Sequence, residues 1–225
     1  MSSCQERIYG SEFTQAEIAE AVRDGRLLSM EIEFNQSCNF RCIYCYASQN
    51  DVRREELSRE EFIDVIQQAK DLGARKIIIL GGEPMLYPHI IDMIRHIRGL
   101  EMEVELFTNG ANITLEIAQT LVENRVRVVL KMNSFDESLQ DTLSGQKGAH
   151  SQIQEAFNNL KLAASEQAPR ICSAVLEVIG IMAYKNDSPY GVGRQLRDAL
   201  SARLMVANER IHAVDAGLLL IAKEV

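Results

Sequence analysis

Apolar residues recur along the chain with the two-residue period of strands in some segments and in continuous buried runs in others. Residues 29–34, SMEIEF, alternate apolar and polar side chains and predict a short strand. Residues 76–80, KIIIL, form a continuous apolar run that is typical of a strand buried on both faces of a sheet. Similar patterns predict three further strands, at residues 102–107, 126–132 and 171–182.

Helical periodicity fills the segments between these strands. The segment LSREEFIDVIQQAKDLGA contains Ser58 followed three residues later by Glu61, a capping box, and its helix is expected to end at Gly73. After Met182 the pattern is weaker and indicates a loop and a helix, then a last strand in AGLLLIA. Three more helices are predicted, in HIIDMIRHIRGL, TLEIAQTLVEN and SQIQEAFNNLKLAA.

This alternation of strands and helices predicts the fold class. Strands separated by helices of about a dozen residues form repeated βαβ units with right-handed crossovers. No linker rich in Pro, Gly or Ser interrupts the units. We therefore expect one α/β domain with parallel strands.

Composition and charge narrow the class of protein. The chain has 225 residues, of which 46% are hydrophobic and 25% charged, as expected of a globular protein with a substantial core. Its net charge is −8, and no basic tract with interleaved aromatic residues is present, so nucleic acid is not expected as a partner. The apolar runs are too short to span a bilayer and the first residues do not resemble a signal peptide. We therefore expect no membrane association and a cytoplasmic location.

Three of the five cysteines lie within eight residues, in CNFRCIYC: Cys38, Cys42 and Cys45. An odd number of cysteines, with Cys4 and Cys172 far away, is not typical of a disulfide framework. Soft thiolates select zinc, copper(I) or iron–sulfur clusters. Structural zinc requires four ligands, whereas three thiolates suit a [4Fe-4S] cluster with one open iron. A structural zinc site, incidental thiols and an electron-transfer cluster with a remote fourth ligand remain alternatives.

Polar residues follow the predicted strands at their carboxyl ends. In GGEP, Gly81 and Gly82 allow close approach of the backbone to a ligand, and the Glu83 carboxylate could accept a hydrogen bond from an ammonium group. Thr108 and Asn109 follow the third strand, and KMNS ends the fourth. Plain turns and helix caps are the alternative at each place. However, the carboxyl ends of parallel strands meet at one edge of a sheet, where α/β and barrel folds build their active sites.

The motif CNFRCIYC, with aromatic Tyr44 before its last cysteine, resembles the CxxxCxxC signature of radical S-adenosylmethionine (radical SAM) enzymes. GGEP and TNG strengthen the resemblance, which covers about residues 29–182. The motifs are similar to those of molybdenum cofactor biosynthesis A-like and SPASM-type enzymes. Cys172 is the only downstream cysteine, so the auxiliary-cluster domain of that branch is not expected here.

The resemblance implies a partial (βα)6 TIM-like barrel, with a lead-in at residues 1–28 and a radical SAM core at 29–182. Residues 183–225 would then be either a last βα unit or an altered or truncated tail. A [4Fe-4S] cluster would be held by Cys38, Cys42 and Cys45. The apolar residues of the fifth strand would pack on adenine near Glu177, Val178 and Ile181. The cofactor-binding residues implied for SAM are Tyr44, Gly81, Gly82, Glu83, Pro84, Thr108, Asn109, Lys131, Asn133 and Ser134.

The resemblance also implies an enzyme and a mechanism. The reduced cluster would cleave SAM to methionine and a 5′-deoxyadenosyl radical, which abstracts a hydrogen atom from a peptide or a small metabolite. The electron would come from a low-potential donor of flavodoxin or ferredoxin type. A glycyl-radical-enzyme activase and a non-catalytic iron–sulfur or zinc protein are the alternative functions. No acid or base acting on the substrate is assigned from the sequence.

Overall fold

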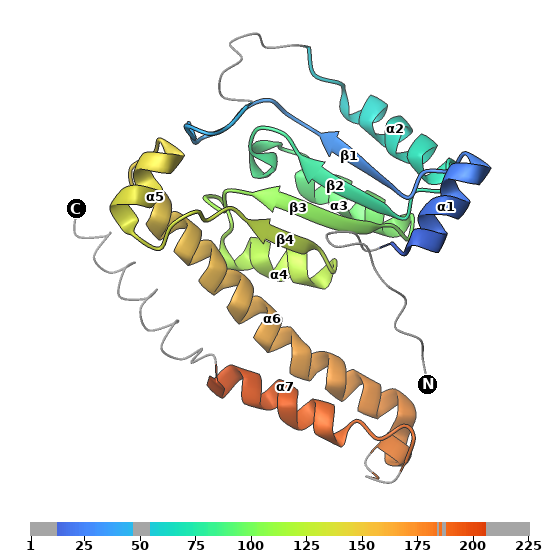
Figure 1. Ribbon diagram of the computed structural model, residues 1–225. Coiled ribbons are helices and arrows are strands. Elements are labelled where there is room, and N and C mark those ends of the chain that lie inside the picture. Colours follow the sequence, from blue (N-terminus) through green and yellow to red (C-terminus); the bar gives the residue numbers. More distant parts are fainter. Residues whose placement is uncertain (1–12, 47–54, 184, 186–187, 206–225) are drawn as a thin grey trace. The chain divides into compact units, whose positions relative to one another are not determined.

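The computed structural model describes residues 13–46, 55–183, 185 and 188–205 (Figure 1). Helices and strands alternate through the first two thirds of the chain, and the remainder is helical as far as it is described. In chain order the elements are α1 (Gln15–Asp24), β1 (Ser29–Glu33), α2 (Arg59–Asp71), β2 (Lys76–Leu80), η2 (Pro84–Leu86), α3 (Ile90–Gly99), β3 (Glu103–Thr108), α4 (Leu115–Glu123), β4 (Arg127–Leu130), α5 (Glu137–Ser144), α6 (Ala149–Ile179), η3 (Gly180–Ala183) and α7 (Gly193–Met205).

The four strands form one sheet in the order β1-β2-β3-β4, and every neighbouring pair is parallel. One row across the sheet consists of Ile32, Ile79, Leu106 and Val128, which are paired in register. The predicted α/β class with parallel strands is therefore confirmed. Because the strands are parallel, their four carboxyl ends lie along one edge of the sheet (Figure 1).

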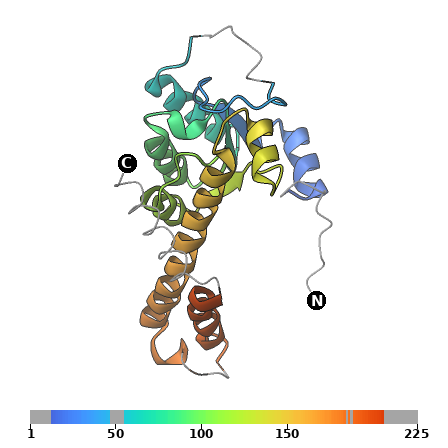
Figure 2. The same cartoon turned by 90° about the vertical axis from the view of Figure 1, so that its left-hand side faces the viewer.

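The core of the sheet lies on the face that α2 and α3 cover (Figures 1 and 2). Ile77 and Ile79 of β2 are fully buried, and their side chains alternate with those of the opposite face, as a strand requires. Ile66 of α2 and Ile94 of α3 are also fully buried. Each such side chain contributes about 1.5 to 3 kcal/mol on burial, so this face holds the strand ends in fixed positions.

Several helices begin at residues whose side chains cap the first turn. The predicted capping box of α2 is confirmed, because Ser58 Oγ accepts a hydrogen bond from Glu61 N at 3.3 Å and Glu61 Oε2 accepts one from Ser58 N at 2.7 Å. Thr114 Oγ1 accepts from a first-turn N–H of α4 at 3.3 Å. Asp136 Oδ1 accepts from Leu139 N of α5 at 2.8 Å, so Asp136 caps the helix that follows β4.

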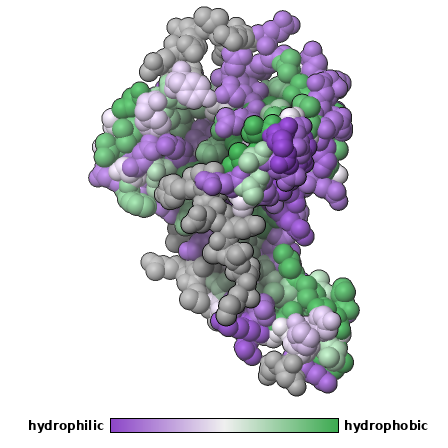
Figure 3. Space-filling model, turned by 45° about the vertical axis from the view of Figure 1, so that its right-hand side comes forward, coloured by the Kyte–Doolittle hydropathy of each residue, from purple (hydrophilic) through white to green (hydrophobic). Residues whose placement is uncertain are grey.

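The predicted fifth strand at residues 171–182 is wrong. Residues 171–179 continue α6, a helix of 31 residues, and residues 180–183 form η3. Val178 and Ile181 are 88% and 74% exposed, so the sequence-based expectation of a buried strand packing on adenine fails for them. Apolar side chains reach the molecular surface among polar ones in Figure 3. The described residues contain four strands rather than six, and the predicted strand AGLLLIA lies outside them.

The chain divides into two compact units. One consists of the residues up to Asn112 together with Asn124–Ile153, and contains the whole sheet. The other consists of Ile113–Glu123 and the residues from Gln154 onward, and within it Asn159 Nδ2 donates to Ile113 O at 2.9 Å. All of the predicted metal and SAM residues belong to the first unit. None of the helices that the structure describes combines the length and apolar character needed to cross a bilayer.

Candidate functional site at the carboxyl ends of the strands

The segment with the three cysteines follows directly from β1. After Glu33 the chain continues through the buried residues Phe34 and Asn35 and turns over the end of the sheet. Cys38, Cys42 and Cys45 are all partly buried and carry free thiols. Cys45 N donates to Cys42 O at 3.1 Å, which closes a turn between the last two cysteines.

An apolar cluster packs against this loop. Phe40, between the first two cysteines, is buried with Ala149 and Ile153, both near the start of α6. Cys38 and Cys42 pack against the same cluster. Removing Phe40 from water favours one position of the loop, and the neighbouring thiols are positioned with it.

The carboxyl end of α5 also holds the loop. Arg41 N donates to Ser144 O, and Ile43 N donates to Leu143 O, both at 3.0 Å. Gly145 follows this helix end with a φ of +59°, and a Cβ there would lie 2.2 Å from Arg41 O. The close approach therefore requires glycine at this position.

The two glycines of GGEP bring the end of β2 against the same loop. Gly82 N donates to Asn35 O at 3.0 Å, and Glu83 N donates to Ser37 O at 2.7 Å. A Cβ on Gly82 would lie 2.1 Å from Ser37 O, and Gly81 has a φ of +119°. The two glycines therefore allow the end of β2 to approach the cysteine loop closely, and their predicted close approach to a ligand stays a prediction.

Glu83 joins the ends of β2 and β3. Its Oε1 accepts from Thr108 Oγ1 at 2.6 Å and from Met85 N at 3.0 Å, and its Oε2 accepts from Asn109 N at 2.8 Å. The residue is 1% exposed. Burial raises the pKa of the carboxyl group, and the three hydrogen bonds oppose that rise because they favour the charged form.

Asn109 connects this carboxylate to the first cysteine. Its Nδ2 donates to Asn39 Oδ1 at 2.8 Å and to Cys38 Sγ at 3.8 Å. Burial raises the pKa of the Cys38 thiol, the hydrogen bond from Phe40 N lowers it, and the nearby charge of Glu83 raises it further. The end of β3 therefore contacts both the buried carboxylate and a thiol.

Tyr44 lies near the end of β4. Lys131 Nζ is 5.6 Å from the centroid of the Tyr44 ring, within the range of a cation–π contact. Burial, then the hydrogen bond and charge of Cys42, raise the pKa of Tyr44 to about 12, while a hydrogen bond with the Asn133 side chain lowers it. The phenol is therefore protonated at neutral pH and can donate a hydrogen bond.

A buried glutamine orders the chain after β4. Gln140 of α5 is fully buried, and its Oε1 accepts from Asn133 N at 2.8 Å and from Ser134 N at 2.9 Å. Its Nε2 donates to Ser144 Oγ at 2.8 Å. Ser134 Oγ accepts from Asp136 N at 3.0 Å, so this hydroxyl takes part in the turn before α5.

The predicted site residues therefore occur in three connected groups. Glycines and Glu83 of GGEP contact the cysteine loop, Thr108 and Asn109 bind Glu83, and Tyr44 lies with Lys131 and Asn133. Pro84 is buried at the first position of η2, where a missing N–H costs nothing. The roles of all these residues in binding a cofactor stay predictions.

Some residues that form hydrogen bonds or close contacts with the predicted site residues were not predicted from the sequence. Asn35 Nδ2 donates to Glu83 O at 3.1 Å, while its buried Oδ1 has no partner among the residues described. Arg41 Nη1 donates to Cys38 O at 2.6 Å. Gln140 and Gly145 act through contacts between distant segments. Only Gly145 carried a local signal, since glycine after a predicted helix commonly ends it.

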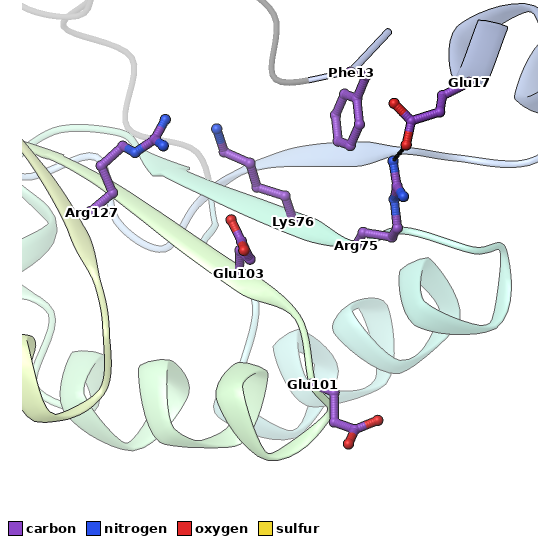
Figure 4. Close-up of a pocket in the computed structure, with 7 residues that line it drawn as sticks. All are labelled: Phe13, Glu17, Arg75, Lys76, Glu101, Glu103 and Arg127. Atoms are coloured by element: carbon purple, nitrogen blue, oxygen red, sulfur yellow. Dashed lines mark hydrogen bonds and ion pairs between the residues drawn. The ribbon is translucent and has the colours of Figure 1, made fainter. Parts of the chain in front are cut away.

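A cavity of about 510 Å³ lies at the opposite edge of the sheet, where the strands begin (Figure 4). It includes none of the predicted site residues. Arg75 Nη2 contacts Glu17 Oε1 there at 2.8 Å. Its lining residues are Phe13, Glu17, Arg75, Lys76, Glu101, Glu103 and Arg127.

The cysteine loop fits an iron–sulfur cluster by its type and number of donors. Within the described residues, no three or more His, Cys, Asp or Glu side chains are arranged to hold a single metal ion. A single zinc ion needs its thiolates to converge at about 2.3 Å from one centre. In a cluster, by contrast, each thiolate binds an iron of its own. The three partly exposed thiols of this loop supply the type and number of donors for a cluster with one open iron.

Comparison with known proteins gives the family. The radical SAM superfamily profile matches residues 32–173. PqqA peptide cyclase of Streptomyces rochei is 34% identical over 123 residues, which cover 54% of this chain and 34% of that protein. GTP 3′,8-cyclase of Microcystis aeruginosa is 32% identical over 127 residues, which cover 53% and 38%.

A solved structure supports the fold. SuiB of Streptococcus suis, crystallised with the precursor peptide SuiA, aligns with a TM-score of 0.53 and 23% identity, over 66% of this chain and 33% of that one. The chain spans between about a third and two fifths of the length of the curated relatives it matches. Since the profile covers more than half of the chain, the protein belongs to the radical SAM superfamily.

Proposed function

We propose that this chain is the core of a radical SAM enzyme, in which Cys38, Cys42 and Cys45 hold a [4Fe-4S] cluster and the ends of β2 to β4 bind SAM. The observation that carries the proposal is the position of Glu83. Its buried carboxylate is linked through Asn109 to the first of the three thiols. A carboxylate this close to a cysteine that binds the cluster could bind a molecule held by the open iron.

Glu83 has the capacity to bind the amino group of SAM. A carboxylate offers about four lone-pair positions, and three are occupied by donors from Thr108, Met85 and Asn109. All three donors are neutral, so none of them supplies a positive charge to balance the buried carboxylate of Glu83. An amino group of the ligand would supply a fourth donor and offset part of the cost of burial.

The remaining residues would position the rest of SAM. Gly81 and Gly82 keep the end of β2 against the cysteine loop. Thr108 donates a hydrogen bond that fixes the carboxylate of Glu83, the residue after these glycines. Lys131, at the end of β4, offers a cation for the carboxylate of SAM. Polar groups of Tyr44, Asn133 and Ser134 lie in the same region and suit the ribose hydroxyls. Pro84 follows Glu83 in the turn after β2 and needs no hydrogen-bond acceptor, because proline has no backbone N–H.

The cofactors would carry out the radical chemistry, and the residues of this chain would bind and orient them. When bound and reduced, the cluster would supply the electron for cleaving SAM to methionine and a 5′-deoxyadenosyl radical, which would take a hydrogen atom from the substrate. A donor of flavodoxin or ferredoxin type would supply that electron. The names of PqqA peptide cyclase and of a sporulation killing factor maturation protein of Bacillus subtilis favour a peptide substrate. The name of GTP 3′,8-cyclase keeps a small metabolite as the second candidate.

The proposal is tested by product formation. The protein is reconstituted anaerobically with iron and sulfide, reduced with dithionite and given SAM, and 5′-deoxyadenosine is measured by mass spectrometry. We expect product from the wild type and none from the triple variant Cys38/Cys42/Cys45→Ala. The matched control is Cys172→Ala, because this fourth described cysteine lies in α6 and should not affect the product. A wild type that holds the cluster but yields no 5′-deoxyadenosine would overturn the proposal.

A further inference from the structure

We propose that Asn109 is a positioning residue that sets the reduction potential of the cluster by donating a hydrogen bond from Nδ2 to Cys38 Sγ. This inference rests on the proposed function, since it requires a cluster on Cys38. The TNG motif alone had suggested that Asn109 binds SAM. The inference assigns a different task to this residue.

The side-chain amide of Asn109 is held in one orientation. Its Oδ1 accepts from Ala111 N at 2.9 Å, and its Nδ2 donates to Asn39 Oδ1 at 2.8 Å. Rotating the amide by 180° would place its NH2 group against the backbone N–H of Ala111, a donor that cannot turn over. The N–H groups are therefore directed toward Asn39 and toward Cys38 Sγ, which is 3.8 Å from Nδ2.

The backbone of Asn109 is held as firmly as its side chain. Its N–H donates to Glu83 Oε2 at 2.8 Å, and the next N–H, of Gly110, donates to Thr108 Oγ1 at 3.0 Å. Asn109 itself makes four hydrogen bonds, with Glu83, Ala111, Asn39 and Cys38, and these fix it between a buried carboxylate and a thiol. A donor already fixed before the electron arrives does not have to reorganise when the charge on the sulfur increases.

The expected effect on the potential follows from charge. Reduction adds one electron to the cluster and makes its thiolates more negative, so a donated N–H stabilises the reduced form more than the oxidised form. The effect is enhanced where the sulfur is partly buried, because the local dielectric constant is low. Phe40 N also donates to Cys38 Sγ, at 3.4 Å, and would remain when Asn109 is changed. Loss of the Asn109 donor should therefore lower the potential without leaving the sulfur bare.

The test is a redox titration followed by electron paramagnetic resonance, in the absence of SAM. The main variant is Asn109→Ser, whose hydroxyl can still accept from Ala111 N but is too short to reach Cys38 Sγ. We expect about a tenfold lower ratio of reduced to oxidised cluster at the wild-type midpoint, which is a shift of about 59 mV to more negative potential for one electron. The matched control is Asn39→Ala, which removes the other acceptor of Nδ2 but leaves Ala111 N to hold Oδ1 in place, so the midpoint should stay unchanged.

The outcomes separate this inference from the proposed function. An unchanged midpoint in Asn109→Ser, in a protein that holds the cluster and cleaves SAM, overturns the inference alone. A wild type that assembles no cluster overturns both. Asn109→Ala gives a second measurement if the serine variant does not take up the cluster. If neither variant holds a cluster while Asn39→Ala does, Asn109 has a purely structural role and the inference is wrong.

Discussion

The contact between GGEP and the cysteine loop makes a sharp prediction for Gly82→Ala. A Cβ at this position would lie 2.1 Å from Ser37 O and 2.8 Å from Gln36 C, so it meets backbone atoms that cannot rotate away. Relief requires the end of β2 to separate from the loop. The hydrogen bonds from Gly82 N to Asn35 O and from Glu83 N to Ser37 O would then be lost or stretched.

The magnitude follows from these contacts. Overpacking costs about 1 to 3 kcal/mol, and two lost hydrogen bonds cost about 1 kcal/mol each. We therefore expect the free energy of unfolding of the apoprotein to fall by about 3 to 5 kcal/mol, a large part of a typical domain stability. The matched control is Gly99→Ala in α3, where an added Cβ would meet nothing within 4 Å and should stabilise by at most about 1 kcal/mol.

The assay is urea unfolding of both variants and the wild type, followed by circular dichroism, with the iron content after reconstitution as a second measure. Gly82→Ala should unfold at lower urea concentration and bind less iron, whereas Gly99→Ala should unfold at the same or a slightly higher urea concentration than the wild type and bind as much iron. If the two variants unfold at the same urea concentration and bind iron equally well, the close approach of β2 to the loop is wrong.

Three further predictions concern single side chains. Glu83→Gln should weaken SAM binding about 10- to 100-fold by equilibrium dialysis, because an amide oxygen cannot accept from all three donors and carries no charge; equal affinity would contradict the proposed contact. Lys131→Ala should raise the Kd for SAM and, measured by the same dialysis, leave the Kd for 5′-deoxyadenosine unchanged, since only SAM carries the carboxylate. The pKa of Glu17 is lowered from 4.5 to about 2, chiefly by the hydrogen bond from Thr14 N and then by Arg75. Its stabilisation is thus present above pH 4.5 and is lost as the pH falls toward 2, so the difference in Tm between wild type and Glu17→Gln should be larger at pH 6 than at pH 3.

The sequence was sufficient for the sheet and insufficient for α6. Each of the four strands was bounded by turn residues and showed a two-residue or continuous apolar pattern, which helices of similar length do not share. Residues 171–182 are also apolar and rich in β-branched residues, and they follow Pro169, a residue type that usually ends or kinks a helix. The structure instead continues the helix through Pro169. Short apolar runs are ambiguous because extending an existing helix costs less than nucleating a new element.

The site was predictable where its residues form local motifs. The cysteines, GGEP and TNG lie at strand ends, and a parallel sheet brings strand ends together whatever their separation in sequence. Asn35 and Gln140 could not be found in this way. Their importance comes from buried hydrogen bonds to Glu83 O and to Asn133 N, and no spacing in the sequence encodes such contacts. Asn109 was found as a motif residue, but its contact with Cys38 became evident only in three dimensions.

The central claim is that one site holds both the cluster and SAM, with Glu83 beside the amino group. Electron–nuclear double resonance tests it most directly, on reduced, reconstituted protein that is frozen immediately after addition of SAM labelled with ¹⁵N at that amino group, before SAM is cleaved. We predict a hyperfine coupling between the cluster and the labelled nitrogen in the wild type, weakened or lost in Glu83→Gln. A protein that contains about four irons and binds SAM, yet shows no such coupling, would contradict the account.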